Sequence, residues 1–159
     1  MKNILLIFLV IVSTACSKGS GGNENSVDID IYLDIFLKNA EGANLIDSEF
    51  YPSQEFKVFH ELNGQNVEII NPKNNTTNGF ILTNDPENKR LRLFVNDQLR
   101  MPISVTYIEW KTGQRDKITA FFDRRDNYLG IVKILLNDAP IWDITTPANG
   151  FGRNITIIK

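Results

Sequence analysis

Apolar and polar residues alternate strictly over residues 27–38. Successive side chains of a β-strand point to opposite faces, so this alternation predicts one long strand with a single buried face. The apolar positions are Val27, Ile29, Ile31, Leu33, Ile35 and Leu37, and the opposite positions are Asp28, Asp30, Tyr32, Asp34, Phe36 and Lys38.

A second alternation covers residues 55–62 and ends at Asn63-Gly64. Asn-Gly between two β-like runs predicts a hairpin, because a type I′ turn needs a positive φ at both central residues. Residues 65–70 would form the returning strand. The positions expected to face inward are Phe56, Val58, His60 and Leu62.

Further β-rich runs, separated by polar turns, fill the rest of the chain. They cover residues 79–83, 90–95, 103–110, 116–122, 130–136, 141–144 and 154–158. No window has a convincing helical period. Many short strands without intervening helices predict an all-β fold, an antiparallel β-sandwich of about 7–9 strands formed by one domain over residues 27–159. A small closed β-barrel is the alternative.

The first 15 residues have the order of a secretory signal peptide. Lys2 gives a positive start, residues 4–12 are all apolar, and small residues at 13–15 precede Cys16. The apolar run is too short for a membrane-spanning helix, which needs about 20 residues. We expect residues 1–15 to be removed and the protein to be exported.

The sequence Ser13-Thr14-Ala15-Cys16 resembles the lipobox of bacterial lipoproteins. The resemblance implies that Cys16, the only cysteine, becomes the first residue and carries fatty acyl chains, palmitate among them. Lipoboxes usually have an aliphatic residue where this chain has Ser13. Ser13-Thr14-Ala15 also suits ordinary signal peptidase, which would release a protein with a free Cys16, so both outcomes stay open.

Composition limits the possible partners. The chain has 17 Lys and Arg against 19 Asp and Glu, a net charge of −2, without the clustered basic surface that nucleic acid or anionic lipid requires. Residues 16–26, CSKGSGGNENS, read as the lipidated cysteine and a flexible tether. The membrane is therefore the expected partner, through the anchor at Cys16, and nucleic acid is not.

Candidate catalytic residues are few. His60, the single histidine, falls on an inward position, and neither an activated nucleophile nor a G-x-S-x-G motif accompanies it. We expect no enzyme activity and no cofactor, with a hydrolase as the least favoured alternative. No metal site is expected either. Asp28, Asp30 and Asp34 share the polar strand face and are weak candidates for calcium, but a solvated strand face is favoured.

Three aromatic residues on polar faces are the candidate ligand-binding residues. Tyr32 and Phe36 lie opposite the apolar stripe, and Phe59 lies among charged neighbours. Exposed rings at such positions stack on sugars or anchor a partner protein. The alternative is that loops or sheet edges cover them. Trp110 and Trp142 are expected in the core.

The tether CSKGSGGNENS and the opening VDIDIYLDIFLKNAEGANLID resemble the small envelope lipoproteins of Bacteroidetes, which carry one immunoglobulin-like or transthyretin-like β-sandwich. The resemblance implies attachment to the outer membrane, facing the periplasm or the cell surface. It also implies a binding or scaffolding module for a glycan or an envelope protein. The alternative is an accessory structural subunit of an outer-membrane complex.

Changing Cys16 to Ser should abolish lipidation, because the acyl chain is attached to the thiol. In a host with the lipoprotein pathway, the wild-type protein should incorporate labelled fatty acid and partition into detergent, and the C16S variant should do neither. Equal labelling of the two proteins would contradict the lipobox assignment.

Overall fold

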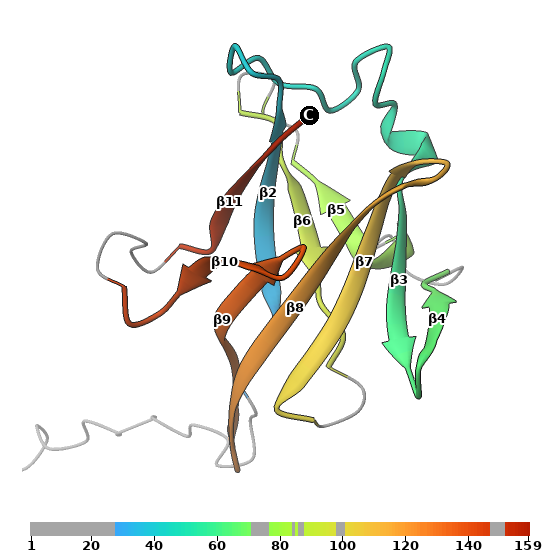
Figure 1. The fold of residues 1–159 in the computed structure, drawn as a ribbon. Coiled ribbons are helices and arrows are strands. Elements are labelled where there is room, and N and C mark those ends of the chain that lie inside the picture. Colours follow the sequence, from blue (N-terminus) through green and yellow to red (C-terminus); the bar gives the residue numbers. More distant parts are fainter. Residues whose placement is uncertain (1–27, 71–76, 84, 86–87, 98–100, 147–151) are drawn as a thin grey trace, which may run out of the picture.

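The computed structural model describes residues 28–70, 77–83, 85, 88–97, 101–146 and 152–159. Within this part of the chain, the strands form two sheets that pack face to face as a β-sandwich (Figure 1). The signal peptide and tether predicted for residues 1–26 lie outside it. The all-β sandwich predicted from the sequence is confirmed.

The larger sheet has seven strands in the order β1-β9-β8-β7-β3-β4, with β10 also paired to β9. Its strands are β1 (Asp28–Asp30), β3 (Lys57–Leu62), β4 (Gln65–Glu68), β7 (Ile103–Lys111), β8 (Gln114–Arg125), β9 (Tyr128–Leu136) and β10 (Ala139–Asp143). The long strands β7, β8 and β9 form its centre, and consecutive strands there are joined by tight turns.

The smaller sheet has four strands in the order β11-β2-β6-β5. They are β2 (Tyr32–Lys38), β5 (Phe80–Leu82), β6 (Leu91–Phe94) and β11 (Asn154–Ile158). Two short 3-10 turns, Ser53–Glu55 and Thr77–Gly79, precede β3 and β5. Neither sheet closes on itself, so the closed barrel that the sequence left open is not formed by the described strands.

Both sheets are mixed rather than purely antiparallel. β1 pairs with β9 and β11 pairs with β2 in parallel, and the other pairs of described strands are antiparallel. The antiparallel prediction rests on short turns between consecutive strands, which is how antiparallel neighbours are joined. Such turns carry no information about the pairs β1–β9 and β11–β2, whose strands are far apart in the sequence.

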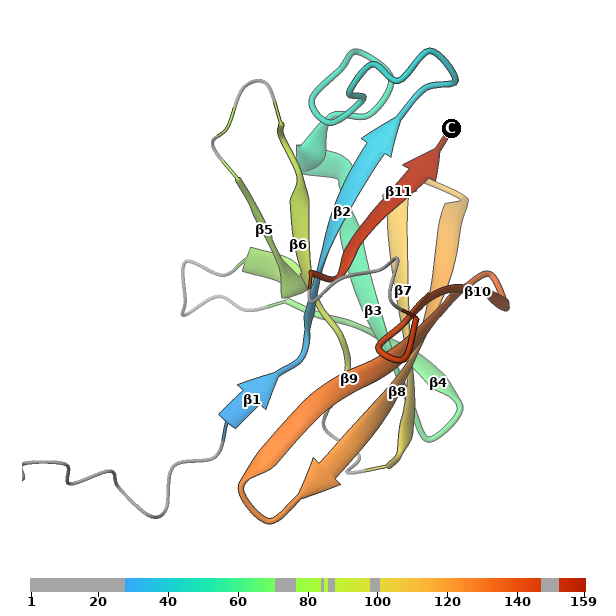
Figure 2. The same ribbon diagram turned by 90° about the vertical axis from the view of Figure 1, so that its left-hand side faces the viewer.

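The single strand predicted over residues 27–38 is wrong in one respect, because the chain changes sheets within it. β1 joins the seven-stranded sheet and β2 joins the four-stranded sheet, as Figure 2 shows. Ile29 is consequently 55% exposed and Ile31 only partly buried. The alternation holds within β2, whose inner residues Leu33, Ile35 and Leu37 are fully buried.

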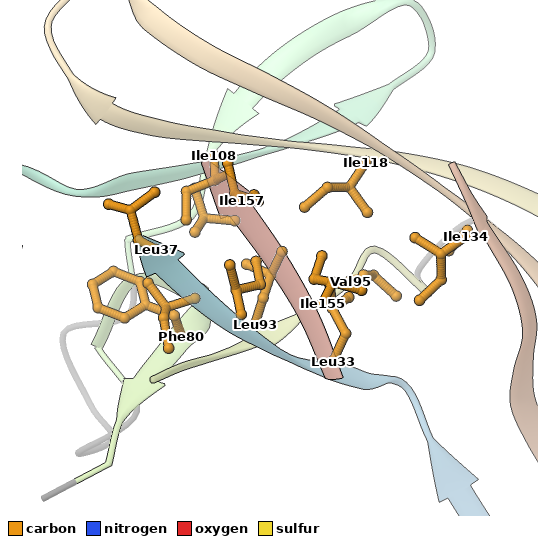
Figure 3. Packing of buried hydrophobic residues seen from close by; sticks show 14 of the residues in the cluster. Leu33, Leu37, Phe80, Leu93, Val95, Ile108, Ile118, Ile134, Ile155 and Ile157 are labelled. Atoms are coloured by element: carbon orange, nitrogen blue, oxygen red, sulfur yellow. The ribbon is translucent and has the colours of Figure 1, made fainter. Parts of the chain in front are cut away.

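The hydrophobic core fills the space between the two sheets. Leu33, Leu93 and Ile155 of the smaller sheet face Ile118 and Ile134 of the larger one (Figure 3). Trp110 and Trp142 are buried, as predicted.

The predicted Asn63-Gly64 hairpin turn is confirmed. Asn63 and Gly64 have φ values of 54° and 76°, and they connect β3 to β4. Both central residues therefore adopt the left-handed region that a type I′ turn requires.

Replacing Ile35 and Ile29 by Asn, in separate variants, tests whether the chain changes sheets. In an unbroken strand with simple alternation, both residues would lie on the buried face. Ile35→Asn should lower the free energy of unfolding by about 4 kcal/mol, because it removes a buried side chain and buries an amide. Ile29→Asn should cost less than about 1 kcal/mol, since Ile29 is largely exposed. Urea denaturation of both variants measures this, and equal costs would contradict the sheet change between β1 and β2.

Candidate functional site

The three candidate aromatic residues do not form one surface. Tyr32 and Phe36 lie on β2 and share its outer face, because the alternate residues of β2 are fully buried. Phe59 lies on β3 in the other sheet. It is only 8% exposed, and the Arg115 guanidinium lies 4.0 Å from its ring centroid. Phe59 is therefore covered and separate from the other two rings.

The residues that share this outer face are fixed by strand register, since directly paired residues point to the same side of a sheet. We call it the β2 face. It comprises Tyr32, Asp34, Phe36 and Lys38 of β2, Arg92 and Phe94 of β6 with Arg90 just before it, Ile81 of β5, and Asn154, Thr156 and Ile158 of β11.

Two guanidinium groups lie over the Tyr32 ring. The guanidinium carbon of Arg92 is 4.1 Å from the ring centroid and that of Arg153 is 5.1 Å from it. Arg153 Nε also donates a hydrogen bond of 2.8 Å to the Tyr32 carbonyl oxygen. The ring quadrupole attracts both cations, and a planar guanidinium packs well against an aromatic face. The Tyr32 ring is thus already in contact with two arginine side chains.

Asp34 is the centre of the charged part of the β2 face. It accepts hydrogen bonds from Arg92 Nε and Nη2 at 2.8 and 2.9 Å, and from Arg90 Nε at 3.0 Å. Burial alone would raise the pKa of Asp34, but the hydrogen bonds and charges of Arg92 and Arg90 outweigh it and hold the pKa below its ordinary value. Asp34 is therefore a buried, ionised carboxylate.

The expectation that Asp28, Asp30 and Asp34 share one solvated strand face is wrong. Asp28 and Asp30 lie on β1 in the seven-stranded sheet, and Asp34 lies on β2 in the other sheet. Asp30 forms an ion pair with Arg153, so two of the three carboxylates already hold arginines. Within the described ranges, no three His, Cys, Asp or Glu residues gather as metal ligands.

The sequence interpretation missed the arginines of this site. Arg90 and Arg92 alternate with Leu91 and Leu93, and that alternation was a signal that they point outward. Their pairing with Asp34 depends on the register of β2 and β6, far apart in sequence. Arg153 precedes β11 and reaches Tyr32 only because β11 pairs with β2.

The β2 face also carries separate apolar side chains. Phe36 is half-buried, and Ile158, which pairs with Lys38 at the end of β2, is 56% exposed. Ile81 is 38% exposed and pairs with Arg92, beside the arginine cluster. The Lys38 ammonium lies 5.8 Å from the Phe36 ring centroid. The β2 face therefore combines a fixed arginine cluster with scattered exposed apolar side chains.

The other sequence candidates lie elsewhere. His60 faces inward between the sheets, as predicted, and is 7% exposed. Cys16 lies outside the described residues. In the part of the chain that the structure covers, no helix has the length and apolar character needed to cross a membrane.

Comparison with known protein families, with curated proteins and with solved structures finds no match to this chain. Its function must therefore be inferred from its own residues.

Replacing Asp34 by Asn should destabilise the protein by about 2 kcal/mol at pH 7, because Arg90 and Arg92 lose their ionised partner. Asp34 has a folded-state pKa below its unfolded value of 3.8, so its contribution is complete above pH 3.8 and is lost as the pH falls through the folded value. Urea titrations should show the wild-type–variant difference shrinking below pH 3.8. Asp28→Asn, at an exposed position, is the matched control and should cost less than about 0.5 kcal/mol.

Proposed function

We propose that this protein is a lipid-anchored binding module of the bacterial cell envelope, which holds a partner protein through its β2 face. In this proposal, Cys16 carries the acyl chains and residues 17–26 are the tether to the sandwich domain. The signal-like residues 1–15, the lipobox-like residues before Cys16 and the polar tether support the envelope location.

The observation that carries the proposal is the ordered arginine cluster around Asp34 and Tyr32. Arginine and tyrosine are enriched among the residues that dominate protein interfaces. Arg92 is held by two hydrogen bonds to Asp34 and by contact with the Tyr32 ring, so it would lose little conformational freedom on binding. Its side chain is still 35% exposed. The cluster is therefore both rigid and accessible.

The charge of the cluster indicates the chemistry of the partner. Three arginines, Arg90, Arg92 and Arg153, meet two carboxylates, Asp30 and Asp34, which leaves an excess of one positive charge. A guanidinium has five N–H donors, and Arg90 gives only one of them to Asp34. The remaining donors suit an acidic side chain of the partner, and the exposed apolar side chains around them, Phe36, Ile81 and Ile158, suit its apolar residues.

A partner protein is favoured over a glycan for two reasons. The Tyr32 ring is already occupied by guanidinium groups, so it is not free to stack on a sugar. The Asp30 and Asp34 carboxylates, which would accept hydrogen bonds from sugar hydroxyls, are engaged by arginines. Permanent docking through the same face would make the protein an accessory subunit of an outer-membrane complex.

The test compares two double variants of the full-length protein as baits for envelope extracts. Phe36→Ala with Arg90→Ala removes one apolar and one cationic group from the β2 face. Ile103→Ala with Lys57→Ala removes the same two kinds of group from the outer face of the seven-stranded sheet and serves as the matched control. A partner of the β2 face should bind at least about tenfold more weakly to the first variant, which corresponds to about 1.4 kcal/mol, and equally well to the control.

The same proteins are then applied to a glycan array, and circular dichroism confirms that each variant keeps its β-sheet spectrum. A protein partner whose affinity is the same for both variants would show that the β2 face is not the site. Binding of a glycan that is weakened only by the β2-face variant would assign the face to carbohydrate and reject a protein partner. A stoichiometric complex that survives purification would favour the accessory subunit over a transient module.

A further inference from the structure

A second candidate site lies at the margin of the sandwich. A pocket of about 240 Å³, open to the surface, lies between β3 and β6 and is bounded by residues of both sheets. We call it the His60 pocket; it is lined by Ile31, His60, Ile69, Gly79, Phe94, Val95 and Asp97. Ile31, Ile69, Phe94 and Val95 have apolar side chains, so the pocket favours a ligand with an apolar body.

His60 is the polar group that distinguishes this pocket from a packing defect. The residue is 7% exposed. The Phe94 backbone can share a hydrogen bond with one ring nitrogen, and no described residue is placed to bond the other. Buried polar atoms in proteins nearly always have a hydrogen-bond partner. A ring nitrogen left without one at the wall of a pocket therefore indicates that a bound molecule supplies it.

The imidazole is neutral at neutral pH. Burial lowers the pKa of His60, and the nearby backbone of Phe94 and the charge of Asp97 offset this only in part. A neutral imidazole has one N–H donor and one nitrogen acceptor. A hydroxyl group can satisfy either nitrogen, because it both donates and accepts.

We propose that the His60 pocket binds a small neutral compound that consists of one apolar ring bearing a hydroxyl group, which hydrogen-bonds the His60 imidazole. The size fits, since an apolar cavity of about 150 Å³ accommodates benzene and this pocket is larger. The Asp97 carboxylate on the wall disfavours an anion such as a carboxylate ligand. The apolar walls disfavour larger polar molecules.

The test uses the full-length protein in detergent, prepared without a histidine tag. His60 is the only histidine of the chain, so the imidazole signals of protein labelled with ¹⁵N-histidine need no assignment. Phenol, toluene, benzoate and benzylamine are titrated separately. Phenol should shift the imidazole nitrogen signals saturably, and toluene and benzoate should bind at least about tenfold more weakly.

Two variants test the assigned roles. His60→Phe keeps a ring but removes both nitrogens, so this variant should bind phenol and toluene with equal affinity. Because it contains no histidine, its affinities are measured by titration calorimetry, alongside the wild-type protein. Ile69→Trp fills the pocket and should weaken both compounds, as ligand-induced shifts of the His60 signals would show. If His60→Phe does not fold, the wild-type selectivity and Ile69→Trp still decide the question.

Three results would overturn the proposal. Absence of a saturable shift with phenol at millimolar concentration would mean that the pocket does not bind the proposed class of compound. Equal affinities of the wild-type protein for phenol and toluene would mean that His60 does not recognise the hydroxyl. Tighter binding of benzylamine than of phenol would mean that Asp97 selects a cation instead.

Discussion

Burial of the inner face of β2 is the constraint on which the rest of the structure depends. Leu33, Ile35 and Leu37 are fully buried against the other sheet, and a shift of β2 by one residue would bring polar side chains into the core. This fixes the register of β2 against β6 and β11. The position of every side chain on the β2 face follows from that register.

The charged part of the β2 face stabilises the same arrangement from outside. A buried carboxylate is unfavourable unless it is paired. Asp34 is paired with Arg92 of the adjacent strand β6 and with Arg90, which directly precedes that strand. Arg153 joins the last strand to both β1 and β2, through Asp30 and the Tyr32 carbonyl. The cluster therefore connects β1, β2, β6 and the start of β11, and it also presents cationic groups to solvent.

The two proposed sites use different properties of one sandwich. The β2 face is the outside of the smaller sheet, where the Tyr32 ring and Asp34 hold arginines in place. The His60 pocket is an open pocket between the two sheets, and a buried imidazole lies on its wall. One site suits a macromolecular partner and the other a small molecule, so their tests are independent. An anchor at Cys16 would place both near the membrane, with the tether allowing the domain to reorient.

The sequence by itself determined what depends on neighbouring residues. Period-two alternation placed Leu33 and Leu37 inward and Tyr32 outward, and Asn63-Gly64 specified its turn, because side-chain direction and backbone φ are local properties. The predictions for residues 1–26 also come from the sequence alone. Only the tertiary structure decided that the chain changes sheets between β1 and β2, that Arg92 pairs with Asp34, and that His60 borders a cavity. These features depend on which distant strands become neighbours, and on how well their side chains fill the space between them, which no local pattern encodes.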